Sequence, residues 1–314
     1  MLREELAAIN ARVPLESFGI SMLGPALLKY GNEEQKREHI PRIVRGEIRW
    51  CQGYSEPGAG SDLASLQTKA EDQGDHYLVN GQKVWTSYAD KADWIFCLTR
   101  TDSSGTKHEG ISFLLFDMAS EGVSTRPIKL ISGKSPFCET FFDNVKVPKQ
   151  SLMGQEGKGW EIAKYLLTHE REMISSFGIS DTLRTLGQIA ADEIGLDATG
   201  RLANPVLRNE LAQFELDTLA FATTMERVHD ETRAGQGLGA ASSIFKYYGT
   251  ELNKRRHELM MSVHGENALG WDGESYHHGD MPRAWLRSKA NSIEGGTSEV
   301  QLNIIAKRVL GLPS

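Results

Sequence analysis

The sequence predicts an α+β multidomain protein, in which a helical segment is followed by a small antiparallel β-barrel or sandwich and then by a helical bundle. Three observations lead to this prediction. The pattern is helical up to Arg45, short β-rich runs separated by turn residues follow, and apolar stripes at helical spacing return after Gly157. We therefore expect three domains, at residues 1–48, 49–153 and 154–314.

The first segment contains a clear helix start. Asn32 is a typical N-cap, and Gln35, three residues later, is a typical capping partner. We expect this helix to end near Gly46, so that the segment is a helical entry to a larger structure.

The middle region is predicted to be rich in strands. The run His76–Val79, the pair Asn80-Gly81 and the run Gln82–Trp85 together form a strong signal for a β-hairpin. Their spacing and turn residues favour antiparallel pairing over a parallel sheet. Further strands are expected at Trp94–Thr99, Ile111–Phe116 and Thr140–Val147.

The last region has two apolar stripes at helical spacing, which are most simply the core of a bundle. Loops are expected at residues 195–205, 235–239 and 265–279. The stripes are Trp160, Ile162, Ala163, Leu166 and Leu167, followed by Leu211, Phe214, Leu219, Ala222, Met225 and Val228.

Charge and composition exclude several classes of partner. The formal net charge is -7, and no basic block is longer than Lys254–Arg256. The sequence therefore lacks the cluster of basic residues that is typical of nucleic-acid binding. The sequence contains no run of about 18 uncharged apolar residues, so no membrane-spanning helix is expected. The histidines show no paired-ligand spacing, so no metal is expected. The three cysteines, Cys51, Cys97 and Cys138, lack metal or disulfide spacing and favour a reducing, cytoplasmic location.

The loop Cys51–Asp62, CQGYSEPGAGSD, is the most informative stretch. Pro57 fixes one dihedral angle, while Gly58 and Gly60 are expected to permit positive φ and a close approach of the backbone. With Tyr54, Ser55 and Ser61 as side-chain donors, such a loop suits a flat or phosphorylated ligand.

Two further motifs have both a functional and an ordinary interpretation. Trp85, Thr86 and Ser87 place a flat ring and two hydroxyls at the end of a strand, which suits an aromatic cofactor, although a single tryptophan in a hairpin is more often a core residue. Near the C-terminus, Glu294 precedes two glycines and a helical run capped by Thr297 or Ser298. The carboxylate either lies against a ligand or is a solvated acid at a helix entry.

Taken together, four collinear motifs resemble the acyl-CoA dehydrogenase family across residues 50–311. The motifs are CQGYSEPGAGSD, VWTS, FFDNVKVP and IEGGTSEVQLNIIAKRVLG. The resemblance implies an N-terminal helical domain, a middle β-domain and a C-terminal four-helix bundle that also forms a tetramer. It further implies an enzyme that uses FAD to convert an acyl-CoA into the trans-2-enoyl thioester and passes electrons to an electron-transfer flavoprotein.

The resemblance also implies roles for individual residues. Glu294 is similar to the base that removes the α-proton while hydride passes to flavin N5, and Arg171 resembles the arginine that pairs with this acid. Tyr54 and Ser55 would hold the pyrimidine side of the flavin, Trp85 would cover one ring face, and Ser87 would reach N5. The remaining expected cofactor contacts are Gln52, Gly60, Ser61, Thr86, Gly265, Thr297 and Glu299, and the expected substrate contacts are Ser61, Arg171 and Gly295.

Several features depart from the family pattern. Only 50 residues precede the CQGYSEPGAGSD loop, so we expect part of the N-terminal helical domain to be missing. The region EIGLDATGRLANP contains Arg201 but no Arg-x-x-Phe-Gly motif, a family glutamine is replaced near Met260–Gly265, and Glu294 is followed by two glycines where many members have one. These differences favour a chain that borrows contacts to the ADP half of FAD from a different subunit.

Two alternatives remain beside the interpretation as an FAD-dependent acyl-CoA dehydrogenase. The chain is either a catalytically idle or FAD-sharing partner subunit of a hetero-oligomer, or a flavin oxidase on the same fold. The retained Glu294 favours dehydrogenation. Straight-chain, branched and ring-bearing thioesters all remain open as substrates.

Overall fold

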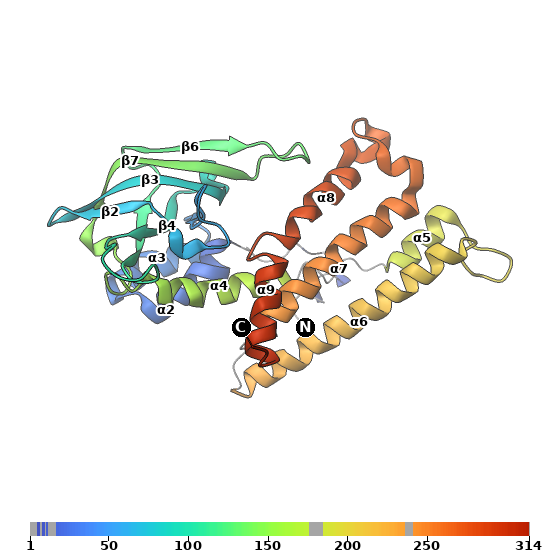
Figure 1. The fold of residues 1–314 in the computed structure, drawn as a ribbon. Helices are drawn as coiled ribbons and strands as arrows, with labels where there is room; N and C mark the ends of the chain where they lie inside the picture. Colours follow the sequence, from blue (N-terminus) through green and yellow to red (C-terminus); the bar gives the residue numbers. More distant parts are fainter. Residues whose placement is uncertain are drawn as a thin grey trace. The chain divides into compact units, whose positions relative to one another are not determined.

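The computed structural model divides the chain into two compact units, which we describe separately. The sheet unit contains Pro14–Leu130 and Lys134–Glu170, and the helical unit contains Met1–Val13, Ile131–Gly133 and Arg171–Ser314. Figure 1 labels their elements. The three predicted domain ranges stay a prediction. The described residues are 5–6, 8–9, 11, 17–175, 185–235 and 241–313, without the side chains of 171–175 and 241.

The sheet unit begins with short helices whose sequence signals are confirmed. Asn32 caps α3 (Glu33–Val44): its Oδ1 accepts from the Gln35 N–H at 2.8 Å, and Gln35 Oε1 accepts from the Asn32 N–H at 3.2 Å. The buried Gln35 amide also donates to the carbonyls of Gln150 and Leu152. The capping residue therefore also ties α3 to the segment after the last strand.

Aromatic residues hold the helices of this unit in place. The preceding helix, α2 (Gly24–Tyr30), contacts α4 (Gly159–Ser175) through an edge-to-face pair of Tyr30 and Tyr165, with centroids 5.6 Å apart. On α3, the His39 ring lies 5.1 Å from Trp50 and 4.9 Å from Trp94, which are paired residues of neighbouring strands. These contacts fix α3 against the sheet.

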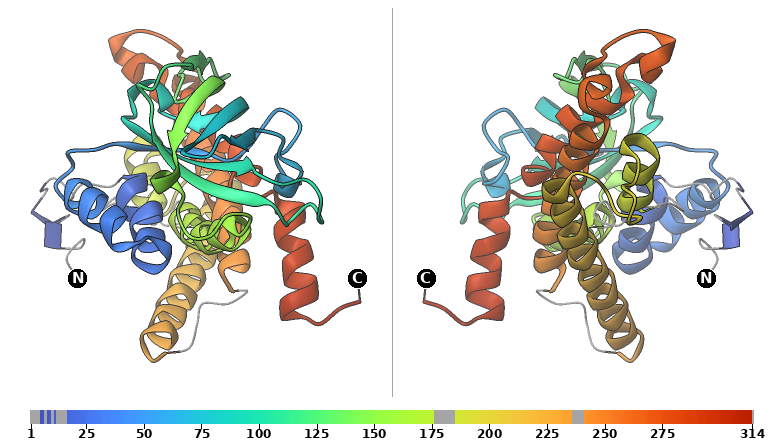
Figure 2. Two further views of the ribbon diagram at one scale, coloured as in Figure 1. Left: turned by 90° about the vertical axis from the view of Figure 1, so that its left-hand side faces the viewer. Right: turned by 90° about the vertical axis from the view of Figure 1, so that its right-hand side faces the viewer.

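Seven strands form one curled sheet, whose twist is visible in the left-hand view of Figure 2. The order is β1-β4-β2-β3-β7-β6, with β5 paired to β4. The prediction of purely antiparallel pairing is wrong, because β4 runs parallel to β1 and, at Lys69 and Arg100, to β2. The strands are β1 (Trp50–Gly53), β2 (Lys69–Asp72), β3 (His76–Ser87), β4 (Trp94–Arg100), β5 (Ile111–Asp117), β6 (Val123–Ile128) and β7 (Phe137–Pro148).

The predicted hairpin at Asn80-Gly81 is also wrong. These residues lie within β3, which continues through them and pairs with β7 on both sides, with a shift in register between Val79 and Gly81. Asn80 Oδ1 accepts from the Asn144 N–H at 2.8 Å. A Cβ on Gly81 would lie 2.7 Å from Thr68 Cα. The glycine therefore serves a bulge and a close approach to Thr68, where turn chemistry suggested a reversal.

The core of the sheet unit consists of alternate strand residues that point to one side of the sheet. It includes all three cysteines, which are buried and free of disulfide bonds. The buried cluster contains Cys51, Ala70, Tyr77, Val79, Ala89, Ile95, Cys97, Leu114, Phe116, Cys138, Phe142, Val145 and Val147.

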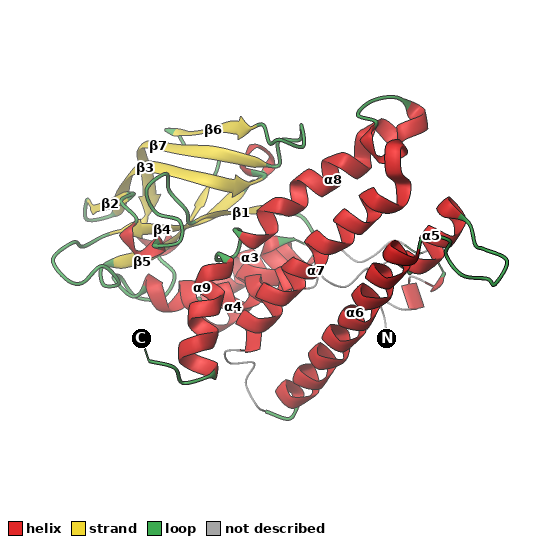
Figure 3. Cartoon of the chain, turned by 45° about the vertical axis from the view of Figure 1, so that its right-hand side comes forward, coloured by secondary structure: helices red, strands yellow, loops and turns green. Residues whose placement is uncertain are grey.

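The helical unit is built around two long helices that run side by side, α6 (Pro205–Arg233) and α7 (Ala241–His264), shown in Figure 3. The predicted α6 stripe is largely buried, but Leu219 is 65% exposed and Phe221 occupies the core instead. Phe221 continues the spacing of seven from Phe214, and Leu219 falls outside it. The other helices are α5 (Leu186–Ile194), α8 (Asp280–Ser288) and α9 (Ser298–Ile304).

Short turns join these helices. The predicted loop at 265–279 contains two 3-10 turns, η6 (Gly265–Leu269) and η7 (Glu274–Gly279). A further turn, η8 (Lys289–Ser292), follows α8. The predicted loop at 235–239 lies outside the described residues after Gly235. Within the described ranges, no helix combines the length and the apolar character needed to cross a bilayer.

One partly buried histidine is expected to make the stability of the helical unit depend on pH. On α7, burial and then the charges of Arg256 and Lys289 lower the pKa of His257 to about 4. In the unfolded chain this histidine has a pKa of about 6.5, so between about pH 6.5 and 4 the unfolded state binds a proton that the folded state does not bind. Stability should therefore be complete above pH 6.5 and fall as the pH drops towards 4. In His257→Gln, the melting temperature measured by circular dichroism should decline less over this interval, and an unchanged decline would contradict the assignment.

Candidate functional site

The loop after β1 presents open glycines on the surface of the sheet unit. Two backbone hydrogen bonds between Glu56 and Ala59, at 2.9 and 3.0 Å, close its turn. Neither Gly58 nor Gly60 has the expected positive φ. A Cβ on either glycine would meet no atom within 4 Å, and Ser61 beside them is exposed. The loop thus leaves room on its outer side, where a flat or phosphorylated ligand is expected.

A buried ion pair supports this loop from beneath. The Glu56 carboxylate accepts from Lys83 Nζ at 2.7 Å and from the backbone N–H groups of Gln67 at 2.6 Å and Thr68 at 2.9 Å. Lys83 Nζ also donates to the Tyr54 carbonyl at 3.1 Å. Burial alone would raise the pKa of Glu56, but the Lys83 charge and these hydrogen bonds hold it below its usual value. Neither residue of this pair was expected from the sequence to contribute to the site.

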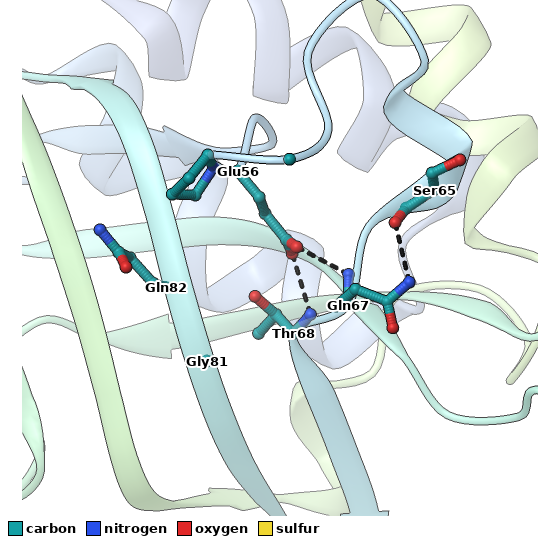
Figure 4. A pocket seen from close by; sticks show the side chains of 8 residues that line it. Glu56, Ser65, Gln67, Thr68, Gly81 and Gln82 are labelled. Atoms are coloured by element: carbon teal, nitrogen blue, oxygen red, sulfur yellow. Dashed lines mark hydrogen bonds between the residues drawn. The ribbon is translucent and has the colours of Figure 1, made fainter.

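The same loop borders a hollow on the side of β3, shown in Figure 4. Its volume is about 500 Å³. Because Lys83 neutralises Glu56, the lining is polar without a net charge. The lining residues are Glu56, Pro57, Gly58, Ser65, Gln67, Thr68, Gly81 and Gln82.

Tyr54 lies in the core instead of on the loop surface. Its ring packs edge-to-face against Phe96 and Phe113, at 6.0 and 6.3 Å between centroids. Burial, with a smaller effect from the Glu170 charge, raises the pKa of Tyr54 well above its usual range. Its hydroxyl has no hydrogen-bond partner among the described residues. From the loop surface, only the backbone of Tyr54 is available to a ligand.

A second carboxylate of the sheet unit lies close to the loop Cys51–Asp62. Glu170 Oε2, on α4, accepts from Gln52 Nε2 at 3.1 Å. Gln52 is in β1, two residues before Tyr54. Gln52 was expected at the site but Glu170 was not, because only the folded chain brings α4 and β1 together.

Trp85 is an exposed flat ring at the end of β3, so its interpretation as a core residue is wrong. The side chain is 54% exposed and contacts Phe137 edge-on at 6.0 Å. Its φ of 61° is rare for a bulky residue and indicates local strain, which is often found at functional sites. Next to it, Thr86 is fully buried and Ser87 is partly exposed. The strand end therefore offers an aromatic face and one accessible hydroxyl.

In the helical unit, Glu294 lies in a tight reversal between η8 and α9. Gly295 and Gly296 have φ values of 65° and 94°, which favour glycine. A Cβ on Gly296 would lie 2.5 Å from Gln301 Nε2, which donates to the carbonyls of both glycines. The double glycine is therefore required by the path of the chain.

Arg287 and Asn291 hold the Glu294 carboxylate. Arg287 Nη2 donates to Oε2 at 2.7 Å and Nη1 to Oε1 at 3.3 Å, while Asn291 Nδ2 donates to Oε1. The Glu294 side chain is only 23% exposed. Glu294 is thus not a freely solvated acid. The expected partner, Arg171, lies in α4, but its side chain is outside the described residues. Arg287 was missed, although its position seven residues before Glu294 is visible in the sequence.

The remaining expected contacts lie around the ends of helices. Thr297 caps α9 by accepting from the Val300 N–H at 3.2 Å. A hydrogen bond from its own backbone, and then one from Thr297, lower the pKa of the exposed Glu299. Gly265 follows α7 with a φ of 54° and open space around it. Arg201 is exposed in the connection between α5 and α6.

Three family models match this chain. They describe the N-terminal, middle and C-terminal domains of acyl-CoA dehydrogenase and match residues 1–47, 51–145 and 157–310. The chain belongs to the acyl-CoA dehydrogenase family. It is therefore an FAD-dependent enzyme, with helical N- and C-terminal parts around a curled-sheet middle domain.

Named relatives agree with this membership. The acyl-CoA dehydrogenase IpdE1 of Mycolicibacterium smegmatis is 37% identical, over 99% of this chain and 79% of the relative. Among solved structures, the Tcur3481-Tcur3483 steroid ACAD is 30% identical with a TM-score of 0.86, over 94% of this chain and 76% of that one. The ChsE4-ChsE5 complex from Mycobacterium tuberculosis is 32% identical with a TM-score of 0.79, over 100% and 81%.

The residues of the sheet unit fit an FAD cofactor. The exposed ring of Trp85 offers a surface for a flat ring system, and the space beside Gly58 and Gly60 allows close approach of a phosphate group to the backbone. The buried ion pair of Glu56 and Lys83 keeps the loop in shape before a ligand arrives. The sheet unit of this acyl-CoA dehydrogenase therefore presents an exposed aromatic ring and a preformed loop, both of which fit the cofactor.

Substituting Gly60 tests whether the open space on the loop serves the cofactor. In Gly60→Ala, the added methyl group meets no protein atom, so the melting temperature of the apoprotein should not change. Where the methyl group meets FAD, overpacking should cost about 1–3 kcal/mol, which weakens binding about five- to 150-fold. Titration of the apoprotein with FAD, followed by flavin fluorescence, measures this. Unchanged FAD affinity would show that the cofactor does not approach the loop here.

Proposed function

We propose that this acyl-CoA dehydrogenase converts an acyl-CoA thioester into the trans-2-enoyl-CoA, with Glu294 removing the α-proton. The observation that carries the proposal is the arrangement around Glu294, where Arg287 and Asn291 donate to a carboxylate that is largely shielded from water. The two donors fix the orientation of the carboxylate and its partial burial limits contact with bulk water, and a general base requires both features.

The chemistry demands more than a base. A thioester α-proton is weakly acidic, so its removal requires a polarised carbonyl and exclusion of water. FAD, when bound, supplies the acceptor for the β-hydride. We assign Trp85 to one face of the flavin, Ser87 to the neighbourhood of N5, and the backbone of Gly60 and Ser61 to the pyrophosphate or the pantetheine arm. The open glycines and the exposed Trp85 ring support these assignments.

For the acyl group, we propose a ring-bearing thioester. The support is the likeness to a structure named as a steroid ACAD, which covers nearly the whole chain. We also propose that the chain works in a hetero-tetramer in which a different subunit contributes contacts to the ADP half of FAD. The similarity to the two-protein ChsE4-ChsE5 complex supports this, as does the absence of an Arg-x-x-Phe-Gly motif beside the exposed Arg201.

The remaining parts of the proposal concern architecture and setting. We propose three domains at residues 1–48, 49–153 and 154–314, a barrel-like middle domain and a four-helix bundle that forms the tetramer. We also propose a cytoplasmic location, which the three free cysteines support. The proposed electron acceptor is an electron-transfer flavoprotein. Gel filtration of the chain expressed alone tests the subunit arrangement, because a homotetramer loaded with FAD would contradict the need for a different partner.

A substrate panel tests the type of acyl group and the electron acceptor. The FAD-loaded protein, with a partner subunit if one is required, is mixed with hexanoyl-CoA, isobutyryl-CoA, cyclohexylpropanoyl-CoA and a CoA thioester of a steroid side chain. We expect the two ring-bearing thioesters to reduce the flavin fastest. Preference for hexanoyl-CoA would refute the substrate class. Rapid reoxidation of the reduced flavin by air would indicate an oxidase.

A further inference from the structure

The loop between β4 and β5, residues Thr101–Gly110, is largely exposed but has a defined shape. Asp102 Oδ1 accepts from the Ser104 N–H at 2.9 Å, and Glu109 Oε2 accepts from the Thr106 N–H at 2.8 Å. Side chains that accept from a backbone donor two or three residues away stabilise turns of this kind. The β4–β5 loop can therefore offer the same surface to a ligand before and after binding.

Arg100, the last residue of β4, joins the β4–β5 loop to the short turn η2 (Leu63–Ser65), which directly follows the loop Cys51–Asp62. Its guanidinium group donates to backbone carbonyls on both sides. The acceptors are Glu109 at 2.7 Å and Lys107 at 3.1 Å in the β4–β5 loop, and Ala64 at 2.7 Å and Leu66 at 3.5 Å at η2. Because the guanidinium donors form a rigid fork, one arginine can hold both segments at once.

An ion pair links the same two segments on their outer side. Lys107 Nζ donates to both oxygens of Asp62, at 2.8 and 3.0 Å, and Ser65 Oγ donates to Asp62 Oδ2 at 2.5 Å. The hydrogen bonds from Lys107 and then Ser65 lower the pKa of Asp62. An exposed ion pair contributes little on its own, so the main link between the two segments is Arg100.

The β4–β5 loop also contacts the first turn of α4. The ring centroids of His108 and Trp160 are 5.2 Å apart. α4 contains Arg171, and Ser61 lies just before η2, and the family resemblance assigns both residues to the substrate. Trp85, which is assigned to the flavin ring, lies at the end of β3 instead. The β4–β5 loop thus joins the two segments that carry expected contacts to the thioester.

We propose that Arg100 is a positioning residue for the acyl-CoA, which holds the β4–β5 loop and the segment Ser61–Leu66 together as one surface for the CoA part of the thioester. This inference rests on acyl-CoA binding under the proposed function, but it does not depend on which residue is the base. Arg100 acts through the backbone oxygens that it holds. A surface whose loops are already ordered binds a long ligand more tightly, because no binding free energy is lost in ordering them.

The two halves of the loop Cys51–Asp62 have separate supports. The buried pair of Glu56 and Lys83 holds the first half, through the Tyr54 carbonyl and the backbone beside the open glycines. Arg100 holds the chain that follows Asp62. Loss of the Arg100 hydrogen bonds should therefore weaken binding of the thioester and leave the affinity for FAD unchanged.

The test measures binding without turnover. The FAD-loaded protein is titrated by calorimetry with the S-cyclohexylpropyl thioether of CoA, which has no thioester carbonyl and cannot be dehydrogenated by the proposed reaction. Arg100→Lys keeps the charge, but a single ammonium group cannot hold both segments. Its Kd for the thioether should rise about threefold to thirtyfold, the range expected for the loss of one or two hydrogen bonds. The affinity of the apoprotein for FAD, followed by flavin fluorescence, should not change.

Steady-state kinetics separate positioning from a general loss of structure. With cyclohexylpropanoyl-CoA, KM should rise in Arg100→Lys by about the same factor while kcat stays unchanged, because the reacting end of the thioester is not displaced. Arg45→Lys, at the exposed C-cap of α3, makes the same substitution away from both loops and should leave Kd unchanged. An unchanged Kd in Arg100→Lys would overturn the proposal. Weaker FAD binding would also overturn it, because the loops would then serve the cofactor.

A second variant keeps the proposal testable if Arg100→Lys does not fold. Replacing Ser103–His108 with two glycines removes most of an exposed loop, a change that proteins usually tolerate, and it leaves Arg100 in place. This variant should also bind the thioether more weakly and FAD normally. Wild-type affinity for the thioether would show that the β4–β5 loop is not part of the substrate surface.

Failure of this inference can be told apart from failure of the proposed function. Normal turnover in the wild type together with an unchanged Kd in Arg100→Lys would refute only the role of Arg100. A wild type that binds the thioether but never reduces its flavin with a thioester would refute the proposed reaction, while the comparison of Kd values would still decide the role of Arg100. A wild type that binds neither the thioether nor any thioester of the panel would refute both.

Discussion

Glu294→Gln should lower the rate of flavin reduction by about 10²- to 10⁴-fold while FAD content and folding stay normal. The amide has nearly the shape of the carboxylate, and its one oxygen can still accept from Arg287 Nη1 and Asn291 Nδ2, but it cannot take a proton. Removal of a general base typically costs this much. Anaerobic stopped-flow measurement of flavin absorbance after mixing with an acyl-CoA gives the rate directly.

Two matched variants make this result specific. Glu266→Gln, an exposed acid in η6, makes the same change of charge in the helical unit and should leave the rate unchanged. Glu170→Gln tests the carboxylate that accepts from Gln52 in the sheet unit. If Glu170→Gln abolished reduction while Glu294→Gln reduced the flavin normally, the base would be assigned to α4 and the present assignment would be wrong.

Lys83→Met should destabilise the sheet unit by about 3–5 kcal/mol, the cost of removing one partner of a buried ion pair. Lys83 is fully buried, and its loss leaves the Glu56 carboxylate with two backbone donors but no neutralising charge. It also removes the donor to the Tyr54 carbonyl at the start of the loop. We therefore expect weakened FAD binding together with a lower midpoint in urea unfolding.

Two comparisons separate burial from charge. Lys107→Met breaks an exposed pair with Asp62 near the same loop, and it should cost no more than about 1 kcal/mol. The double variant Lys83→Met/Glu56→Gln should recover part of the stability lost in Lys83→Met, because no buried charge is then left alone. A loss for Lys83→Met as small as that for Lys107→Met would contradict the structural role of the pair.

Local sequence signals predicted the fold where local interactions decide it. The capping pair of Asn32 and Gln35 marks a helix that forms as expected, because its hydrogen bonds join residues three apart. Asn80-Gly81 failed as a turn signal, because pairing with β7 on both sides and the approach of Thr68 outweigh the preference of two residues. β1 was missed because four residues carry too little pattern, and its parallel partner lies over 40 residues away.

The candidate site was predictable to a similar extent. Glu294 and Trp85 stand out in motifs, and the structure places them in a shielded carboxylate arrangement and on an exposed strand end. Tyr54 looked like a surface donor, but its ring fills the space beside Phe96 and Phe113. The partners of the site residues come from distant elements, and no spacing rule connects α4 to β1 or Lys83 to the loop Cys51–Asp62.

The central claim is that this chain oxidises an acyl-CoA with its FAD. The most direct measurement is a single turnover under anaerobic conditions. The FAD-loaded protein is mixed with a ring-bearing acyl-CoA, and the mass of the thioester product is measured by mass spectrometry. We predict bleaching of the flavin together with a thioester that has lost two hydrogen atoms, in equal amounts. A flavin that binds but stays oxidised with every thioester of the panel, while the thioesters are recovered unchanged, would contradict the account.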